Sequence, residues 1–143
     1  MRSIPVALVK QGRTQKRRII YNDFRCLVDT ASAFGCAVVG IEQVNGVPGQ
    51  SGPASFQFGK GVGLVIAALM ERTGREPIEV PPNVWKRHHG LPLASRIGRT
   101  EVKKASRLKA IELWPHAAHL FSRAMDEGLA EACLIAEFLR VKG

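Results

Sequence analysis

The sequence lacks the patterns that mark several familiar classes of protein. Its three cysteines contain no CxxC pair, which argues against a disulfide framework and against a cysteine zinc site. No apolar run reaches the length of about 18 residues that a transmembrane helix needs, and the N-terminus has no signal-peptide layout. We therefore expect a cytoplasmic protein with no membrane partner.

Common catalytic loops are also missing. The chain has no GxSxG elbow, no GK[ST] phosphate loop and no HExxH zinc motif. Gly59, Gly61 and Gly63 do not form a dinucleotide fingerprint, because they lie inside an expected helix instead of following a strand. We expect no small-molecule cofactor.

Acidic residues are few relative to basic ones. Lys and Arg total 21 against 12 Asp and Glu, which gives a net charge of +9. Such a balance suits a polyanionic partner, most commonly nucleic acid. The basic residues cluster, and the candidate DNA contacts in the clusters of the second half are Lys86, Arg87, Lys103, Lys104 and Arg107. The same clusters would also suit a plain solvated surface, so charge alone leaves both interpretations open.

Short apolar segments alternate with helical patterns along the chain. The strands that we expect cover residues 4–9, 18–21, 36–41 and 77–80. The helices that we expect cover residues 22–34, begin at 55, 81 and 100, and end with 126–141. This alternation predicts one α/β domain over residues 1–143.

Two of these helices have an apolar pattern that predicts their inner face. In the helix beginning at residue 100, the pattern places Leu108, Ile111 and Leu113 inward. In the last helix, the residues expected inward are Leu129, Ala132, Cys133, Ala136 and Leu139. Pro115 either breaks the first of these helices or opens the next turn.

Glu42 is the main candidate for chemistry. It ends the strand at 36–41, whose apolar composition predicts burial on both faces. An unpaired buried carboxylate is costly, so either a cationic group meets Glu42 at the strand end or the strand stops there and opens to water. Glu131 also needs a partner, because it lies on the apolar side of the last helix. If the two converge, they could bind Mg²⁺, which in a basic protein suggests two-metal phosphodiester cleavage. Asp126 and Glu127, near the start of that helix, could join them or simply favour the helix dipole.

Several short motifs occur in a characteristic order. They are AVVGIEQV at 37–44, VPGQ at 47–50, FGKGVG at 58–63, VWK at 84–86, KKASR at 103–107 and SRLKAIELWP at 106–115. With the acidic last helix, this order resembles the RuvC-type Holliday-junction resolvases, particularly their phage-encoded branch. The resemblance covers nearly the whole chain from Arg17 onward.

The resemblance implies an RNase H-like fold, with a mixed sheet flanked by helices, and a homodimer. It also implies Mg²⁺ or Mn²⁺ as cofactor and paired nicks in branched or four-way DNA, within a bacterial or phage-infected cell. Matched to the family pattern, Glu42 is the second metal-binding acid. Glu131 is the acid of the last helix, with Asp126 or Glu127 as companion.

The resemblance also assigns DNA contacts. Lys104 falls where the family has a lysine near the scissile phosphate, which makes it a catalytic candidate. Val47 and Gln50 match the loop that meets the junction centre. Lys60 lies in the glycine-rich segment 58–64, which would let the DNA backbone or a second copy approach closely.

One element of the family pattern is absent. The family begins with a central strand that ends in a metal-binding aspartate, and no aspartate precedes Asp23. The strand at 4–9 could take that place without its acid, the gene could begin further upstream, or the protein could be a degenerate relative. We therefore expect a metal-dependent endonuclease of the resolvase type, with a non-catalytic DNA-binding protein on the same fold as the alternative. A basic RNA-binding protein is a third possibility.

Overall fold

A short parallel sheet brings distant parts of the chain together. In the structure, a computed structural model, β3 (Gly40–Glu42) pairs with β4 (Ile78–Val80), and Glu42 lies opposite Val80. The structure describes residues 6–11, 14–19, 22, 26, 29, 38–45, 49–93 and 98–142. These residues belong to two units, one within 1–39 and 45–77 and the other within 40–44 and 78–143.

The first unit contains an antiparallel hairpin. Strand β1 (Val6–Gln11) pairs with β2 (Thr14–Ile19), in a register that sets Val6 opposite Ile19 and Gln11 opposite Thr14. The predicted strand at 4–9 corresponds to β1, whereas β2 begins at Thr14, four residues before the strand predicted at 18–21, because Thr14 and Gln15 are paired with Gln11 and Lys10. Backbone hydrogen bonds hold the pair together, so polar residues can extend it. Of the helix predicted over 22–34, residues 22, 26 and 29 are helical and the rest lies outside the described residues.

The first unit also contains the long helix α2 (Gly52–Thr73). Pro53 lies in its first turn, where a missing N–H costs nothing, so the helix begins three residues earlier than the sequence predicts. Gly74 ends the helix with φ +66° and donates its N–H to the carbonyl of Met70 over 2.9 Å. By length and composition α2 could cross a membrane, but this is weak evidence, because the core helix of a soluble protein meets the same criterion.

In the second unit, helix α6 (Glu127–Lys142) packs against β3. The contact is close, since a methyl group added at Gly40 would collide with Leu139 of α6. The expectation of a strand buried on both faces is wrong: all three residues of β3 are partly exposed, and Val38 just before it is 55% exposed. Among the described residues, β3 pairs with β4 and packs against α6, and this coverage leaves part of each of its residues accessible.

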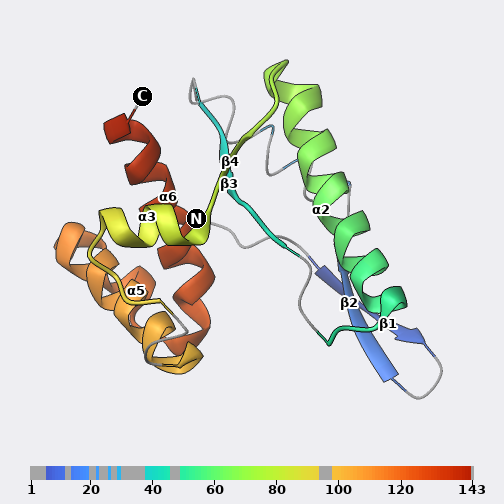
Figure 1. The fold of residues 1–143 in the computed structure, drawn as a ribbon, viewed down its shortest axis with the longest axis horizontal. Helices are drawn as coiled ribbons and strands as arrows, with labels where there is room; N and C mark the ends of the chain where they lie inside the picture. The colour runs from blue at the N-terminus through green and yellow to red at the C-terminus, as the bar shows by residue number, and fades with distance from the viewer. Residues whose placement is uncertain are drawn as a thin grey trace. The chain divides into compact units, whose positions relative to one another are not determined.

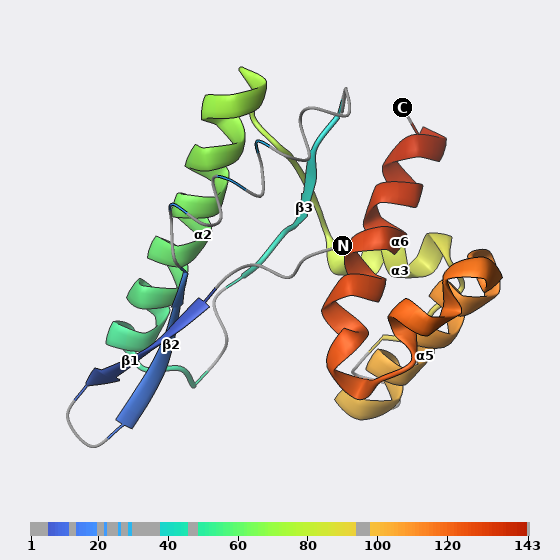
Figure 2. The same ribbon diagram turned by 180° about the vertical axis from the view of Figure 1, so that it is seen from behind.

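Helix α3 (Pro82–His88) follows β4 directly and carries the centre of the core. Trp85 is fully buried and packs with the buried residues Val80, Leu134 and Ile135. Burying an aromatic side chain of this kind contributes about 1.5–3 kcal/mol. Figure 1 and Figure 2 both show α3 beside α6, and the two helices are in contact.

Helix α5 (Arg99–Leu113) packs against α6 through small side chains. Ser106, Ala110 and Ala130 have no exposed surface, so the two helix backbones lie close together. The predicted inner face of α5 is wrong at Leu108 and Leu113, which are exposed, and is confirmed at Ile111, which packs against the core. In α6 the predicted face is wrong at Ala132 and Ala136, which are exposed, whereas the buried residues are Ala130, Leu134 and Ile135.

Two short 3-10 helices join α5 to α6. The first, η1 (Pro115–Phe121), begins at Pro115, so this proline opens a new turn. The second, η2 (Ala124–Asp126), leads directly into α6. The described residues thus confirm a mixed α/β chain, and their strands form two sheets of two strands each. The RNase H-like sheet and the single domain over 1–143 stay predictions.

Candidate functional site

Glu42 is held at the end of β3 by a tryptophan. The Nε1–H of Trp85 donates a hydrogen bond to Oε1 of Glu42 over 3.2 Å. The contact follows from the local fold, because Glu42 pairs with Val80 and the chain turns at Pro81 directly into α3. The strand therefore delivers its carboxylate to the first turns of α3.

Glu131 of α6 is held by a serine and a lysine. The hydroxyl of Ser106 lies 3.3 Å from Oε1 of Glu131 and 3.2 Å from the carbonyl oxygen of Val102. The Nζ of Lys86 lies 3.6 Å from the same Oε1, which makes an ion pair. Three helices, α3, α5 and α6, thus fix the position of one carboxylate.

The two carboxylates lie close enough to influence each other. Burial is the largest cause that raises the pKa of Glu42 above its ordinary value of 4.5, and the negative charge of Glu131 raises it further. The positive charge of Lys86 and the hydrogen bond from Trp85 lower it in part. The two carboxylates therefore belong to one electrostatic neighbourhood, and their convergence on a shared cation stays a prediction.

This donor set fits one hard divalent cation. Mg²⁺ is commonly held by one or two carboxylates, with water and phosphate oxygens completing its six ligands. Within the described ranges, no group of three or more His, Cys, Asp and Glu side chains could hold a metal ion. The two-metal arrangement that the sequence suggests needs more ligands than Glu42 and Glu131, and metal binding by this pair stays a prediction.

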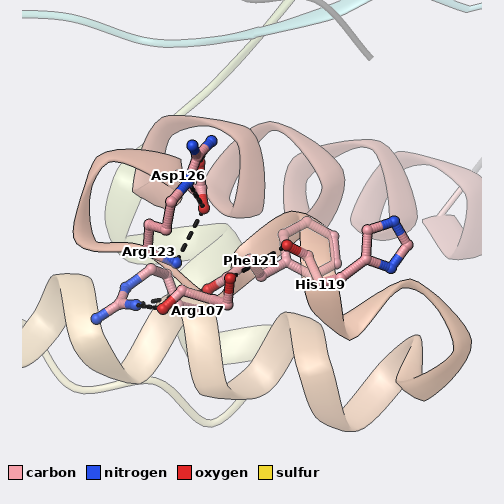
Figure 3. Close-up of polar contacts among 6 residues, drawn as sticks. Arg107, His119, Phe121, Arg123 and Asp126 are labelled. Carbon is pink, nitrogen blue, oxygen red and sulfur yellow. Dashed lines mark hydrogen bonds and ion pairs between the residues drawn. The ribbon is translucent and has the colours of Figure 1, made fainter.

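Asp126 makes a different set of contacts. Both of its carboxylate oxygens accept hydrogen bonds from the side chain of Arg123, at 3.1 and 2.9 Å, and Oδ2 also accepts from the Arg123 backbone N–H at 2.9 Å. Figure 3 shows this pair at the turn that leads into α6. The hydrogen bonds from Arg123 lower the pKa of Asp126. These contacts indicate that Asp126 caps η2, and its predicted role as a metal ligand stays a prediction.

Lys103 and Lys104 are exposed on α5, and Glu127 is the partly exposed first residue of α6. Lys103 forms an ion pair with Glu127, so each has a partner. Lys104 is exposed, and within the part of the chain that the structure describes it makes no ion pair. Of these three candidates, Lys104 has the side chain that is available to a phosphate.

The remaining DNA-binding candidates are distributed over both units. Arg87 is exposed on α3, and Arg107 donates to the carbonyl oxygen of Ser122 over 3.0 Å and to that of Phe121 over 3.5 Å (Figure 3). Gln50 and Lys60 are exposed in the first unit. Val47 lies outside the described residues.

The adjacent histidines have structural contacts. Nε2–H of His89 donates to the carbonyl oxygen of Leu134 over 2.8 Å, and burial lowers the pKa of this imidazole. The rings of His88 and His89 meet edge to face, with centroids 4.8 Å apart.

Sequence reasoning missed two residues of the site, Trp85 and Ser106. Each has a detectable signal: a buried indole N–H or hydroxyl needs an acceptor, and Ser106 interrupts the inner face of α5 between Val102 and Ala110. Lys86 was expected to contact DNA, and its ion pair with Glu131 was not foreseen.

No protein-family model matches the chain, and no curated protein matches it.

Proposed function

We propose that this protein is a metal-dependent endonuclease of the Holliday-junction resolvase type, which acts on branched DNA in recombination or repair. The observation that supports this best is that one short helix, α3, contacts two carboxylates from distant parts of the sequence: Trp85 binds Glu42 and Lys86 binds Glu131. In a chain with a net charge of +9, an acidic pair of this kind suits a cation-assisted reaction on a polyanion.

Each residue of the site has a role in the proposal. Glu42 and Glu131 would hold Mg²⁺ or Mn²⁺. When bound, the metal would polarise a phosphate and lower the pKa of an attacking water. Trp85 and Ser106 would orient the two carboxylates, as outer-shell partners do in metal sites. Lys104 would contact a DNA phosphate, and a homodimer would place one such site on each of two strands.

The test is cleavage of a labelled four-way DNA junction in Mg²⁺, in Mn²⁺ and in EDTA. We expect paired nicks only with metal. Glu42→Gln and Glu131→Gln should each lower the nicking rate by more than about a hundredfold, because loss of a mere outer-shell partner already costs up to about that much. The matched control is Glu79→Gln, an exposed residue of β4 with the same change of charge. Nicking that survives in Glu42→Gln contradicts the proposal.

A second function, DNA binding without cleavage, is favoured by one specific observation. Glu131 already has a cationic partner in Lys86, and the described residues offer two converging carboxylates in place of a larger ligand set. This alternative predicts junction binding that weakens steeply with salt, and no nicks in any metal. Tighter binding to RNA than to a DNA junction would instead support an RNA-binding role.

A further inference from the structure

Lys86 is buried to an extent that is unusual for a lysine. Its side chain is only 14% exposed, and its Nζ lies 3.6 Å from Oε1 of Glu131. Lysine is rarely buried unless it is paired, because its ammonium group loses hydration. The ion pair with Glu131 therefore accounts for its place inside the protein.

A second contact holds the same ammonium group. Nζ of Lys86 lies 5.0 Å from the centre of the Trp85 ring, within the range of a cation–π interaction. Trp85 and Lys86 are neighbours on α3, yet the first binds Glu42 and the second binds Glu131. One short helix thus supplies a partner to each carboxylate.

The ammonium group of Lys86 also lies near Glu42, because the Trp85 ring that it covers donates its Nε1–H to that carboxylate. Two carboxylates in a partly buried place repel each other, and an ammonium group beside them offsets part of this repulsion. A divalent cation held by the same two carboxylates would lie close to Nζ. Two positive charges that lie close together and away from bulk water repel each other strongly.

We propose that Lys86 is an internal counter-cation of the Glu42–Glu131 pair, which a divalent metal must displace in order to bind. Lys86 is a positioning residue in this scheme. It stabilises the metal-free protein and weakens metal binding, because the favourable free energy of its ion pair with Glu131 is lost when the metal binds. The inference rests on the proposed function in one respect, namely that Glu42 and Glu131 bind the metal.

The first experiment measures Mn²⁺ binding, by electron paramagnetic resonance of the free ion, in the wild type and in Lys86→Met. Removal of the ammonium group should tighten Mn²⁺ binding about tenfold or more. Lys86→Arg, which keeps the charge, should leave affinity near that of the wild type. The matched control is Lys109→Met, which also removes a lysine from an ion pair with a glutamate, Glu112, and should not tighten binding.

The outcomes separate this inference from the proposed function. If the wild type binds Mn²⁺ and Lys86→Met binds it equally or more weakly, the inference is overturned and the metal site stands. If only Lys86→Met binds Mn²⁺, the inference holds and metal-dependent cleavage by the wild type fails. If neither protein binds Mn²⁺, both are overturned.

A second experiment needs no variant and decides the matter even if Lys86→Met does not fold. The wild-type protein is acetylated with and without saturating Mg²⁺, and modification of each lysine is followed by mass spectrometry. Displacement of the ammonium group predicts that Mg²⁺ raises the acetylation rate of Lys86 several-fold and leaves Lys109 unchanged. A rate at Lys86 that stays the same or falls overturns the inference.

Discussion

The indole N–H of Trp85 donates to Oε1 of Glu42 over 3.2 Å, and this hydrogen bond joins the hydrophobic core of the second unit to its candidate site. Trp85 is fully buried, so its polar atom would be unsatisfied without the carboxylate. The same residue therefore stabilises the fold and orients Glu42.

Trp85→Phe should separate these two effects. Loss of a hydrogen bond to a charged acceptor is expected to lower the free energy of unfolding by about 1–3 kcal/mol, and to raise the pKa of Glu42, because this bond favours the ionised form. Urea unfolding and a carbon NMR titration of the glutamate carboxyls measure the two quantities. The control is Trp114→Phe, since Trp114 packs in the same core and is not a hydrogen-bond partner of Glu42 in the described structure. An unchanged Glu42 pKa in Trp85→Phe would contradict this role.

The raised pKa of Glu42 predicts a specific dependence of stability on pH. The pKa of Glu42 is 4.5 in the unfolded chain and higher in the folded protein. At pH values between these two pKa values, the folded protein binds more protons at Glu42 than the unfolded chain does. The contribution of Glu42 to stability therefore decreases as the pH rises through that window, and it stays low above it. Glu42→Gln should remove this decrease, so the variant should be more stable than the wild type at neutral pH. Urea unfolding from pH 4 to 8 tests this, and a variant that is less stable at neutral pH would refute it.

Asp126→Asn should destabilise the protein by removing the ionic hydrogen bonds with Arg123. These bonds lower the pKa of Asp126 in the folded protein below its unfolded value of 3.8. Their contribution to stability is therefore fully present above pH 3.8 and is lost as the pH falls through the lower pKa of the folded protein. Wild type and variant should therefore differ in melting temperature at neutral pH and converge in acid. Arg123→Gln should behave similarly. Weaker Mn²⁺ binding in Asp126→Asn would show instead that this carboxylate belongs to the metal site.

Gly40→Ala tests the close packing of β3 against α6. The added methyl group would collide with Leu139, and overpacking of this kind costs about 1–3 kcal/mol. Shortening the opposing side chain makes room, so the double variant Gly40→Ala/Leu139→Ala should lose less stability than the two single effects added together. Additive losses in urea unfolding would show that the two positions do not contact each other.

Lys104→Gln tests the expected phosphate contact. If Lys104 neutralises one phosphate, the variant should bind a four-way junction more weakly, and the slope of log affinity against log salt should become shallower by about one unit. Lys109→Gln is a suitable control on the same helix, because Lys109 is paired with Glu112. An equal change in both variants would indicate a general effect of net charge instead of a contact.

Much of the local structure could be predicted from the sequence, because it depends on residues close together in the chain. Proline and glycine mark the limits of helices through their fixed or permissive backbone angles, as Gly74 does for α2 and Pro115 does for η1. Glu42 was also identified as the end of a strand, since a carboxylate after an apolar run has few other favourable places.

The inner faces of the helices were decided by tertiary structure. An apolar pattern favours large side chains, and so it selected Leu108 and Leu113 for the core. The actual contact between α5 and α6 uses Ser106, Ala110 and Ala130, because small side chains let two helices pack closely. No local pattern contains that information, since it depends on which helix lies opposite.

For the candidate site too, some features depend on the sequence alone and others on the tertiary structure. The sequence by itself determined that Glu42 and Glu131 are acids in apolar surroundings that require partners. Only the tertiary structure decided what those partners are: Trp85 for one, Ser106 and Lys86 for the other. The physical reason is that burial and charge depend on groups brought together in space, where β3, α3, α5 and α6 meet, and not on groups adjacent in the chain.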